Sequence, residues 1–204
     1  IAPTYNQSKR IAWDYLLEYT RSLGGKANIA ELRVDFMGKR ISLYGADNPD
    51  SLRGIYLDGC VLDEIGNINP TLFTEIIRPA LSDRLGYCVA MGTPKGQNHF
   101  KDLRDRGMRE EGWKLLEFKS SETNILNADE LKSARNEMGE DKYQQEFECS
   151  FNAPVEGAYY SSMINELDEK KQIIDIPKDE LARTYTGWDL GMSDSTSIWV
   201  AQVV

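Results

Sequence analysis

Apolar and polar positions along the chain predict helices and strands that follow one another closely. A helix is expected over residues 8–21, where the apolar residues have a spacing that puts one face against a sheet: Ile11, Ala12, Tyr15, Leu16 and Tyr19. Ile1-Ala2 reads as the last part of a strand, which Pro3-Thr4 turns into this helix. Residues 31–44 predict two short strands around a hairpin turn at Met37-Gly38-Lys39.

The next group of elements surrounds an apolar run that ends in two acids. Residues 55–64 read as a buried strand followed by two consecutive carboxylates. A helix capped by Asn69 and begun by Pro70 is then expected over 70–84, and a second buried strand over 87–91. A strand, a helix and a strand of this length predict parallel pairing through a right-handed crossover.

The remainder of the chain predicts more helices and then a change in character. The expected elements are a helix over 98–108, a strand over 113–118, a helix that Asn127 caps with Glu130 as its capping-box partner and Gly139 ends, and a helical turn over 142–147. Residues 151–180 predict a linker and the approach to a second domain. Residues 184–204 predict two strands with a turn between them.

Composition restricts the class of protein. The chain has 204 residues, of which 41% are hydrophobic and 28% charged, as in an ordinary soluble globular protein. No apolar run is long enough to cross a bilayer, and no signal peptide opens the chain. The formal net charge of −9 argues against a uniformly basic coat for nucleic acid, but it permits a local basic channel.

The cysteines and the histidine do not suggest a metal site or a nucleophile. The three cysteines are widely spaced without metal-ligand spacing, so we expect reduced, buried thiols in a cytoplasmic protein. The single histidine, His99, has no Ser or Cys partner pattern. A structural or nucleic-acid-facing role is therefore expected for it rather than a catalytic one.

Asp63 and Glu64 are the first candidates for chemistry. Open α/β sheets bind ligands at the carboxyl ends of their strands, where the central strand delivers both acids. In an α/β nucleotide hydrolase, the first acid can hold Mg²⁺ through water, and the second can polarise a water for attack on a γ-phosphate. The alternative is a solvated strand end, because an apolar run before Asp-Glu also occurs by chance.

Two further candidates flank this strand. The strand at 87–91 ends at Gly92-Thr93-Pro94, whose small hydroxyl-bearing tip suits a γ-phosphate sensor, and the alternative is a simple turn. Arg53 lies in the loop before the central strand. Its guanidinium either reaches the γ-phosphate of a neighbouring subunit or pairs with Asp47 or Asp50 to hold the loop.

The end of the chain carries a candidate metal ligand. Asp189 lies in a strand that pairs in a hairpin, which is how ribonuclease-H-like folds place a metal ligand. Alternation puts Trp188 and Leu190 on one face of the strand and Asp189 on the other. Asp194 is a second candidate, although aspartates in turns commonly cap backbone amides. The alternative is a hairpin with one exposed aspartate.

The order of these motifs resembles the large terminase subunit of tailed bacteriophages, the motor that packages DNA into a prohead. The similar segments are Ala2-Pro3-Thr4 with Gln7 and Trp13, Gly45-Ala46-Asp47-Asn48-Pro49 with Leu52-Arg53-Gly54, Val61-Leu62-Asp63-Glu64, Gly92-Thr93-Pro94, Gln145-Glu146-Phe147 with Cys149 and Phe151, and Gly187-Trp188-Asp189-Leu190-Gly191 with Asp194. Taken in the same order, these segments resemble six parts of that family. They are the strand and helix after the phosphate-binding loop, the segment before the second nucleotide motif, the second nucleotide motif itself, the coupling motif, the exit to the nuclease domain and the opening of the nuclease.

The resemblance implies an α/β fold with two domains. Residues 1–150 would form a P-loop, RecA-like ATPase core with a parallel sheet, 151–183 a linker, and 184–204 the start of a ribonuclease-H-like nuclease domain. ATP and Mg²⁺ are the implied cofactors, with Mn²⁺ as an alternative at the nuclease site. The implied partners are double-stranded DNA, the portal protein, the small terminase subunit and further copies in a ring on the portal. The implied location is the host cytoplasm, without a membrane.

The resemblance also assigns roles to the candidate residues. Catalytic roles fall to Glu64 and Arg53, coupling of ATP to DNA movement to Gly92 and Thr93, and metal binding to Asp63, Asp189 and Asp194. A metal-dependent endonuclease that cuts the DNA concatemer would accompany the ATPase.

Two parts of the family pattern are absent from these residues. No G-x-x-x-x-G-K-[ST] loop is present, and we expect it before Ile1 in a longer protein; the remaining nuclease acids are expected after Val204. This stretch by itself is therefore expected to be inactive. Two alternatives remain: a helicase-like DNA-dependent ATPase, which would not need Asp189, and an inactive ATPase fold kept as an assembly module.

Overall fold

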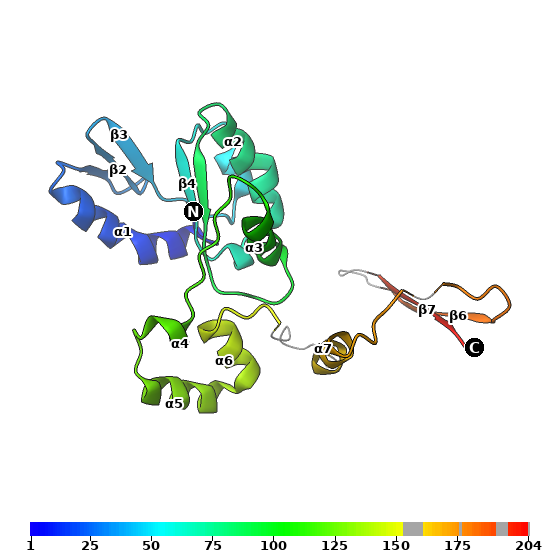
Figure 1. Ribbon diagram of the computed structural model, residues 1–204. Coiled ribbons are helices and arrows are strands. Elements are labelled where there is room, and N and C mark those ends of the chain that lie inside the picture. Colours follow the sequence, from blue (N-terminus) through cyan, green and yellow to red (C-terminus); the bar gives the residue numbers. More distant parts are fainter. Residues whose placement is uncertain (153–160, 176, 191–195, 204) are drawn as a thin grey trace. The chain divides into compact units, whose positions relative to one another are not determined.

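The computed structural model of the chain describes residues 1–152, 161–175, 177–190 and 196–203 (Figure 1). They belong to two units, Ile1–Ala158 and Tyr159–Val204, which are taken in turn. Whether the functional domains follow the boundaries 1–150, 151–183 and 184–204 stays a prediction. No helix among the described residues is long and apolar enough to span a membrane.

The first unit begins with a helix on a small antiparallel sheet (Figure 1). Helix α1 (Tyr5–Arg21) starts three residues earlier than expected, because the Thr4 side chain accepts a hydrogen bond from the Gln7 amide and caps it. The sheet has the order β1-β2-β3, with β1 at Lys26–Asn28, β2 at Arg33–Phe36 and β3 at Lys39–Ser42. The expected hairpin is confirmed, and β1 was not anticipated.

The predicted buried face of α1 is only partly right, because Leu16 packs against the core beneath the helix and the other large residues of that face do not. Ile11, Tyr15 and Tyr19 are exposed, at 49%, 59% and 70%. The helix instead packs through Trp13, which forms a cluster with the two most buried apolar residues of this part, Leu32 and Val34; Leu16, Leu17, Phe36 and Leu43 surround that cluster. The large indole sits off the expected stripe, and its burial decides the rotation of the helix.

A parallel pair of strands forms the centre of this unit. Strand β4 (Gly59–Leu62) pairs with β5 (Tyr87–Ala90), as the sequence predicts, with Leu62 opposite Ala90. Strand β4 is shorter than expected, since residues 55–58 lie outside the ladder. The prediction that both strands are buried is wrong for one face, where Val61 and Val89 are 46% and 45% exposed, because only the other face of the pair packs on the core. On its other side the Ile1 amine donates to the Val61 carbonyl at 2.8 Å.

Ile1-Ala2 therefore extends this sheet, and its prediction as a strand end is confirmed in outline. The Asp63 amide donates to the Ile1 carbonyl at 2.8 Å. Ala2 forms a parallel bridge with Gly45, so this short segment lies between β4 and residues 44–46. The carboxyl end of β4 is thus flanked by backbone on both sides.

The helical segment between β4 and β5 is not one regular α-helix. It consists of a π-helical turn at Leu72–Ile77 (η3) and helix α2 (Arg78–Ser82). Pro79 lacks the N–H of an α-helical bond, and the Arg78 amide reaches back five residues to Phe73. The segment packs on the strand pair and contributes four residues to the main core. The buried residues of that core are Ala46, Leu52, Cys60, Leu62, Ile65, Ile68, Leu72, Ile76, Ile77 and Leu81.

Helix α3 (His99–Arg109) also packs on this core, through Phe100 and Leu103 (Figure 1). The strand expected over 113–118 is wrong: these residues form no regular element and pair with no strand in the described part of the chain. An apolar run becomes a strand only where another strand accepts its backbone bonds. Leu116 and Phe118 are accordingly exposed, at 63% and 71%.

Short helices complete the first unit. They are α4 (Ser120–Thr123), α5 (Ala128–Met138) and α6 (Glu140–Phe147). The Asn127 cap is confirmed, since its side chain accepts from the Glu130 amide at 2.7 Å. Phe151 is buried beside α3, where its ring contacts that of Phe100 and its carbonyl accepts from the Gln97 side chain at 3.3 Å.

The second unit contains a helix and a hairpin. Helix α7 (Ser161–Glu169) lies in the stretch expected to be a linker and was not anticipated. Strands β6 (Thr184–Asp189) and β7 (Ser197–Gln202) pair antiparallel, which confirms the predicted hairpin.

The three cysteines are free thiols; Cys60 is buried, and Cys88 and Cys149 are half-buried.

Candidate nucleotide-hydrolysis site

The two acids lie directly after β4, at its carboxyl end. Asp63 still belongs to the sheet, because its amide bonds the Ile1 carbonyl. Its carboxylate accepts from the Glu64 amide at 3.1 Å, and its side chain is half-buried. The chain leaves the sheet at the next residue, which is where open parallel sheets place ligand-binding groups.

Glu64 has a left-handed backbone conformation, with φ 51° and ψ 45°. This conformation costs a residue with a side chain about 1–2 kcal/mol, so the surrounding structure must stabilise it. Two backbone bonds do so: the Ile65 amide donates to Met91 at 3.0 Å, and the Asn67 amide to Glu64 at 2.9 Å. The turn continues as the short 3₁₀-helix η2 (Ile65–Asn67).

The environment of Glu64 favours a neutral carboxyl more than water does. Burial raises the pKa of Glu64 above its usual value. The negative charges of Asp63 and of Glu146, on α6, raise this pKa further, and the Lys95 ammonium opposes the rise. A carboxylate with a raised pKa is a better proton acceptor, which is what a general base requires.

Gly92 and Thr93 lie in the loop that follows β5 against this turn. A Cβ on Gly92 would lie 3.1 Å from the Glu64 Cα and 3.3 Å from the Ile65 nitrogen, and its φ is 155°. Thr93 is half-buried, and its carbonyl oxygen faces Gly66. The structure thus brings Gly92, Asp63 and Glu64 together at one edge of the sheet.

Arg53 is held by local acids. It follows the short 3₁₀-helix η1 (Pro49–Leu52), and its Nε donates to Asp50 at 2.8 Å while its Nη2 lies 3.5 Å from Glu75. The side chain is 54% exposed, and none of its described contacts is with the acid pair. Asp47 instead accepts from the Tyr5 amide at the start of α1.

The sequence analysis missed the side chains that hold the acid turn. Lys95 donates to Asn67 at 2.7 Å, Asn98 donates to Gly66 at 3.3 Å, and His99 lies 2.8 Å from the Ile65 carbonyl. The one available signal was the polar run after Gly92-Thr93-Pro94, because polar groups directly after a buried strand commonly bond neighbouring loops.

Metal ligands are few in the described part of the chain. No group of three or more His, Cys, Asp or Glu among those residues could hold a metal ion. Asp189 is exposed at the end of β6, opposite Ser197, rather than in mid-strand. Asp194 lies outside the described residues. The metal-binding roles of Asp63, Asp189 and Asp194 therefore stay predictions.

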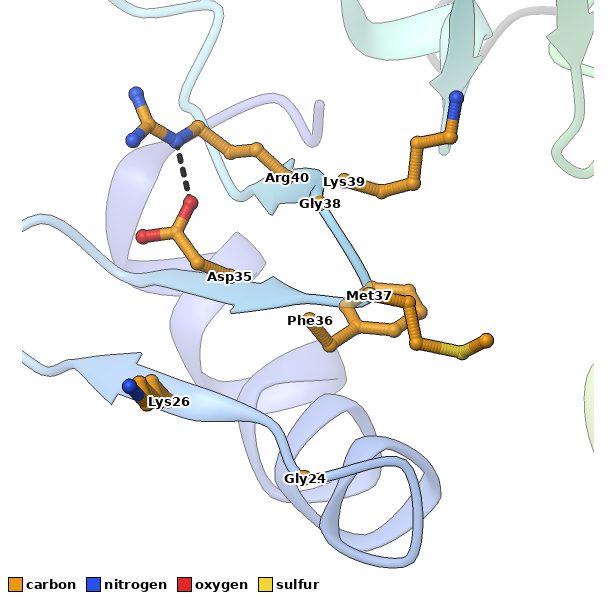
Figure 2. Close-up of a pocket in the computed structure, with 8 residues that line it drawn as sticks. All are labelled: Gly24, Lys26, Asp35, Phe36, Met37, Gly38, Lys39 and Arg40. Atoms are coloured by element: carbon orange, nitrogen blue, oxygen red, sulfur yellow. Dashed lines mark hydrogen bonds and ion pairs between the residues drawn. The ribbon is translucent and has the colours of Figure 1, made fainter.

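A basic hollow lies at the β2–β3 turn, and neither Asp63 nor Glu64 lines it (Figure 2). Its volume is about 540 Å³. Its charged lining consists of Lys26, Lys39, Arg40 and one acid, Asp35, which accepts from the Arg40 Nε at 2.7 Å. Figure 2 shows Lys26 and Lys39 apart from this pair. On a chain with a net charge of −9, this hollow is a local concentration of positive charge.

Relatives of this chain are large terminase subunits, although no family model matches it. The subunit of Thermus phage G20c is 41% identical over 75 residues, which are 37% of this chain and 14% of that protein. That of Escherichia phage T5 is 23% identical over 210 residues, covering 97% of this chain and 47% of the relative. The chain thus spans about half or less of the length of these curated relatives.

Solved structures agree with the sequence relatives. The ATPase domain of the Thermus phage P74-26 large terminase matches with a TM-score of 0.60 and 26% identity, over 74% of each chain. The large terminase of another thermophilic bacteriophage shares the fold, with a TM-score of 0.62 and 19% identity over all of this chain and 51% of that one. This chain is therefore a homologue of phage large terminase subunits and has the RecA-like α/β fold of a terminase ATPase domain.

Proposed function

We propose that this chain carries the hydrolytic part of an ATP-driven motor that moves double-stranded viral DNA into a prohead. The observation that carries the proposal is the position of Asp63 and Glu64 at the carboxyl end of a parallel strand, with Gly92 of the loop after the neighbouring strand packed against Glu64. The homology to large terminase subunits supports it, and the large terminase of the second thermophilic phage is known in complex with ADP and with ATP-γ-S.

Asp63 suits a Mg²⁺ ion that is shared with a nucleotide. Mg²⁺ usually binds through one or two carboxylates, with phosphates and waters supplying the other ligands, and an all-protein cage is not needed. A half-buried single carboxylate at the strand end fits that requirement. When bound, the ion neutralises charge on the phosphates.

Glu64 is the proposed general base. Its carboxylate accepts the proton of the water that attacks the γ-phosphate, and burial next to Asp63 raises its pKa toward a value suited to that task. Asp63 still bonds the sheet, whereas the backbone becomes left-handed at Glu64, and this difference supports separate roles for the two acids. Gly92 and Thr93 belong to the proposed coupling segment.

The test is the substitution Glu64→Gln in the intact protein. The amide keeps the size of the side chain but accepts no proton, so ATP hydrolysis should fall by about 10²–10⁴-fold with the affinity for ATP retained. Glu137→Gln, which changes an exposed acid of α5, is the matched control. Undiminished hydrolysis by Glu64→Gln would refute the role of Glu64 as the base.

A second proposed activity is a metal-dependent endonuclease that cuts the packaged DNA. Asp189 is its proposed ligand for Mg²⁺ or Mn²⁺, with Asp194 as a second one. The β6–β7 hairpin supports this proposal, since two-metal nucleases collect carboxylates from several strands. Other acids must complete the site, because no such group exists among the described residues.

The proposed partners follow from the same motor. They are double-stranded DNA, the portal protein, the small terminase subunit and further copies of the chain in a ring on the portal. The basic hollow at Lys26, Lys39 and Arg40 is the proposed contact with DNA phosphates, because it concentrates positive charge on an acidic chain.

A further inference from the structure

The turn that carries Glu64 is held from outside by the segment that runs from the loop after β5 into the start of α3. This segment places three polar side chains along the turn, and each bonds a different residue of it. The His99 Nε2 lies 2.8 Å from the Ile65 carbonyl oxygen, the Asn98 Nδ2 donates to the Gly66 carbonyl at 3.3 Å, and the Lys95 Nζ donates to the Asn67 Oδ1 at 2.7 Å.

The contact between His99 and the Ile65 carbonyl has only one possible donor. A carbonyl oxygen only accepts, so the His99 ring must donate through Nε2–H. The position of that donor is itself fixed, because His99 is the first residue of α3. Asn98 caps the helix by accepting from the Phe100 amide at 3.0 Å. The donor thus belongs to a regular element rather than to a free loop.

The turn needs this support. Glu64 occupies a left-handed conformation that a residue with a side chain rarely adopts unless the surroundings impose it. Ile65 is buried, and its carbonyl also accepts from the Ile68 amide at 3.0 Å, so removal of the histidine would leave this carbonyl with one of its two partners. A relaxed turn would change the direction in which the Glu64 side chain projects.

We propose that His99 is a positioning residue for Glu64: its Nε2–H bond to Ile65 holds the left-handed turn and so directs the Glu64 carboxylate. The proposal rests on the proposed function, in which Glu64 is the general base. His99 itself touches no reacting atom. A misplacement of the base by about 1 Å lowers turnover by about 10²-fold, and it does not alter contacts to the nucleotide made elsewhere.

Two variants of the intact protein separate the bond from the shape of the side chain. His99→Gln replaces Nε2 with an amide nitrogen of similar reach, whereas His99→Phe keeps a ring without a donor. We expect kcat for ATP to fall about 10²-fold in His99→Phe with KM within about twofold, and to be largely rescued in His99→Gln. Hydrogen exchange of the Asn67 amide, measured without nucleotide, should accelerate in His99→Phe alone.

The outcomes distinguish this inference from the proposed function. A normal kcat in His99→Phe, equal losses in both variants or an unchanged Asn67 exchange rate would overturn the inference alone, provided that hydrolysis still depends on Glu64. Hydrolysis that survives Glu64→Gln would overturn the proposed role of Glu64 and the inference with it. Amides of the β2–β3 hairpin, which His99 does not contact, serve as the internal control for hydrogen exchange.

Discussion

Gly92 lies so close to Glu64 that a Cβ at position 92 would be 3.1 Å from the Glu64 Cα. The loops after β4 and β5 therefore pack backbone against backbone. We expect Gly92→Ala to displace the acid turn and to lower ATP hydrolysis by at least about 10-fold, since small misplacements of a catalytic group are costly. Gly187→Ala is the control, because a Cβ there meets nothing closer than 4.0 Å. Equal activity of the two variants would contradict the prediction.

Arg53 provides a test of action between subunits. A finger that reaches a neighbour's γ-phosphate contributes about 10³–10⁵ in rate, whereas the observed pairing with Asp50 indicates a local role. If Arg53 acts across subunits, rings that mix Arg53→Ala and Glu64→Gln subunits should recover hydrolysis that neither variant shows alone. Absence of recovery, together with equal thermal destabilisation by Arg53→Ala and Asp50→Ala, would assign Arg53 to the loop.

Thr93 is expected to affect movement more than hydrolysis. Its loop lies against Gly66 in the acid turn and continues to α3, which supports the proposed role of Thr93 in reporting the state of the phosphate. Thr93→Ala should therefore reduce DNA translocation more than ATP turnover, while Thr93→Ser, which keeps the hydroxyl, should reduce neither. Parallel losses of both activities in Thr93→Ala would indicate a plain role in folding or binding.

The basic hollow is expected to contribute to DNA affinity through charge. Replacing Lys26 and Lys39 by Gln removes two cations that have no ion pair among the described interactions. The slope of log K against log salt for a short duplex should become shallower by about 0.9 for each phosphate that is no longer neutralised. Lys119→Gln, which removes a lysine paired with Glu122, should leave the slope unchanged. The same slope in all three proteins would exclude the hollow.

Asp189 separates a packaging motor from a helicase-like ATPase. Its carboxylate is exposed at the end of β6, in the second unit, so its removal tests the proposed metal ligand separately from the acids after β4. Asp189→Ala should abolish metal-dependent cleavage of plasmid DNA and leave ATP hydrolysis near normal. Asp179→Ala, another acid of the same unit, is the comparison. Cleavage that persists in Asp189→Ala would make Asp189 only a strand residue.

The sequence was most informative where the apolar pattern and the turn residues agree. The strand before Asp63, the strand before Gly92 and their parallel pairing are confirmed, since both apolar runs end at turn residues. Their predicted burial is confirmed for one face only, because Val61 and Val89 are exposed. The hairpin around Met37-Gly38 is also confirmed, because a hairpin is a local structure that its own turn residues specify.

The failures involve interactions that depend on tertiary structure. Residues 113–118 have a strand-like composition but no strand beside them in the described part of the chain, and one indole, that of Trp13, determines which face of α1 is buried. The bond from His99 to Ile65 joins residues 34 positions apart, so it depends on the path of two loops. Neither hydrophobic spacing nor turn propensity contains that information.

The buried ring of Phe151 gives the first turn of α3 a second attachment. Gln97 and Phe100 hold Phe151, while Asn98 and His99, between them in the sequence, hold the turn of Glu64. A helix is stiff over such a distance, so the start of α3 is held on one side by Phe151 and on the other by the turn of Glu64. A shift of the turn during a hydrolytic cycle must therefore tilt the start of α3 and displace Phe151, unless the packing of that ring prevents the shift.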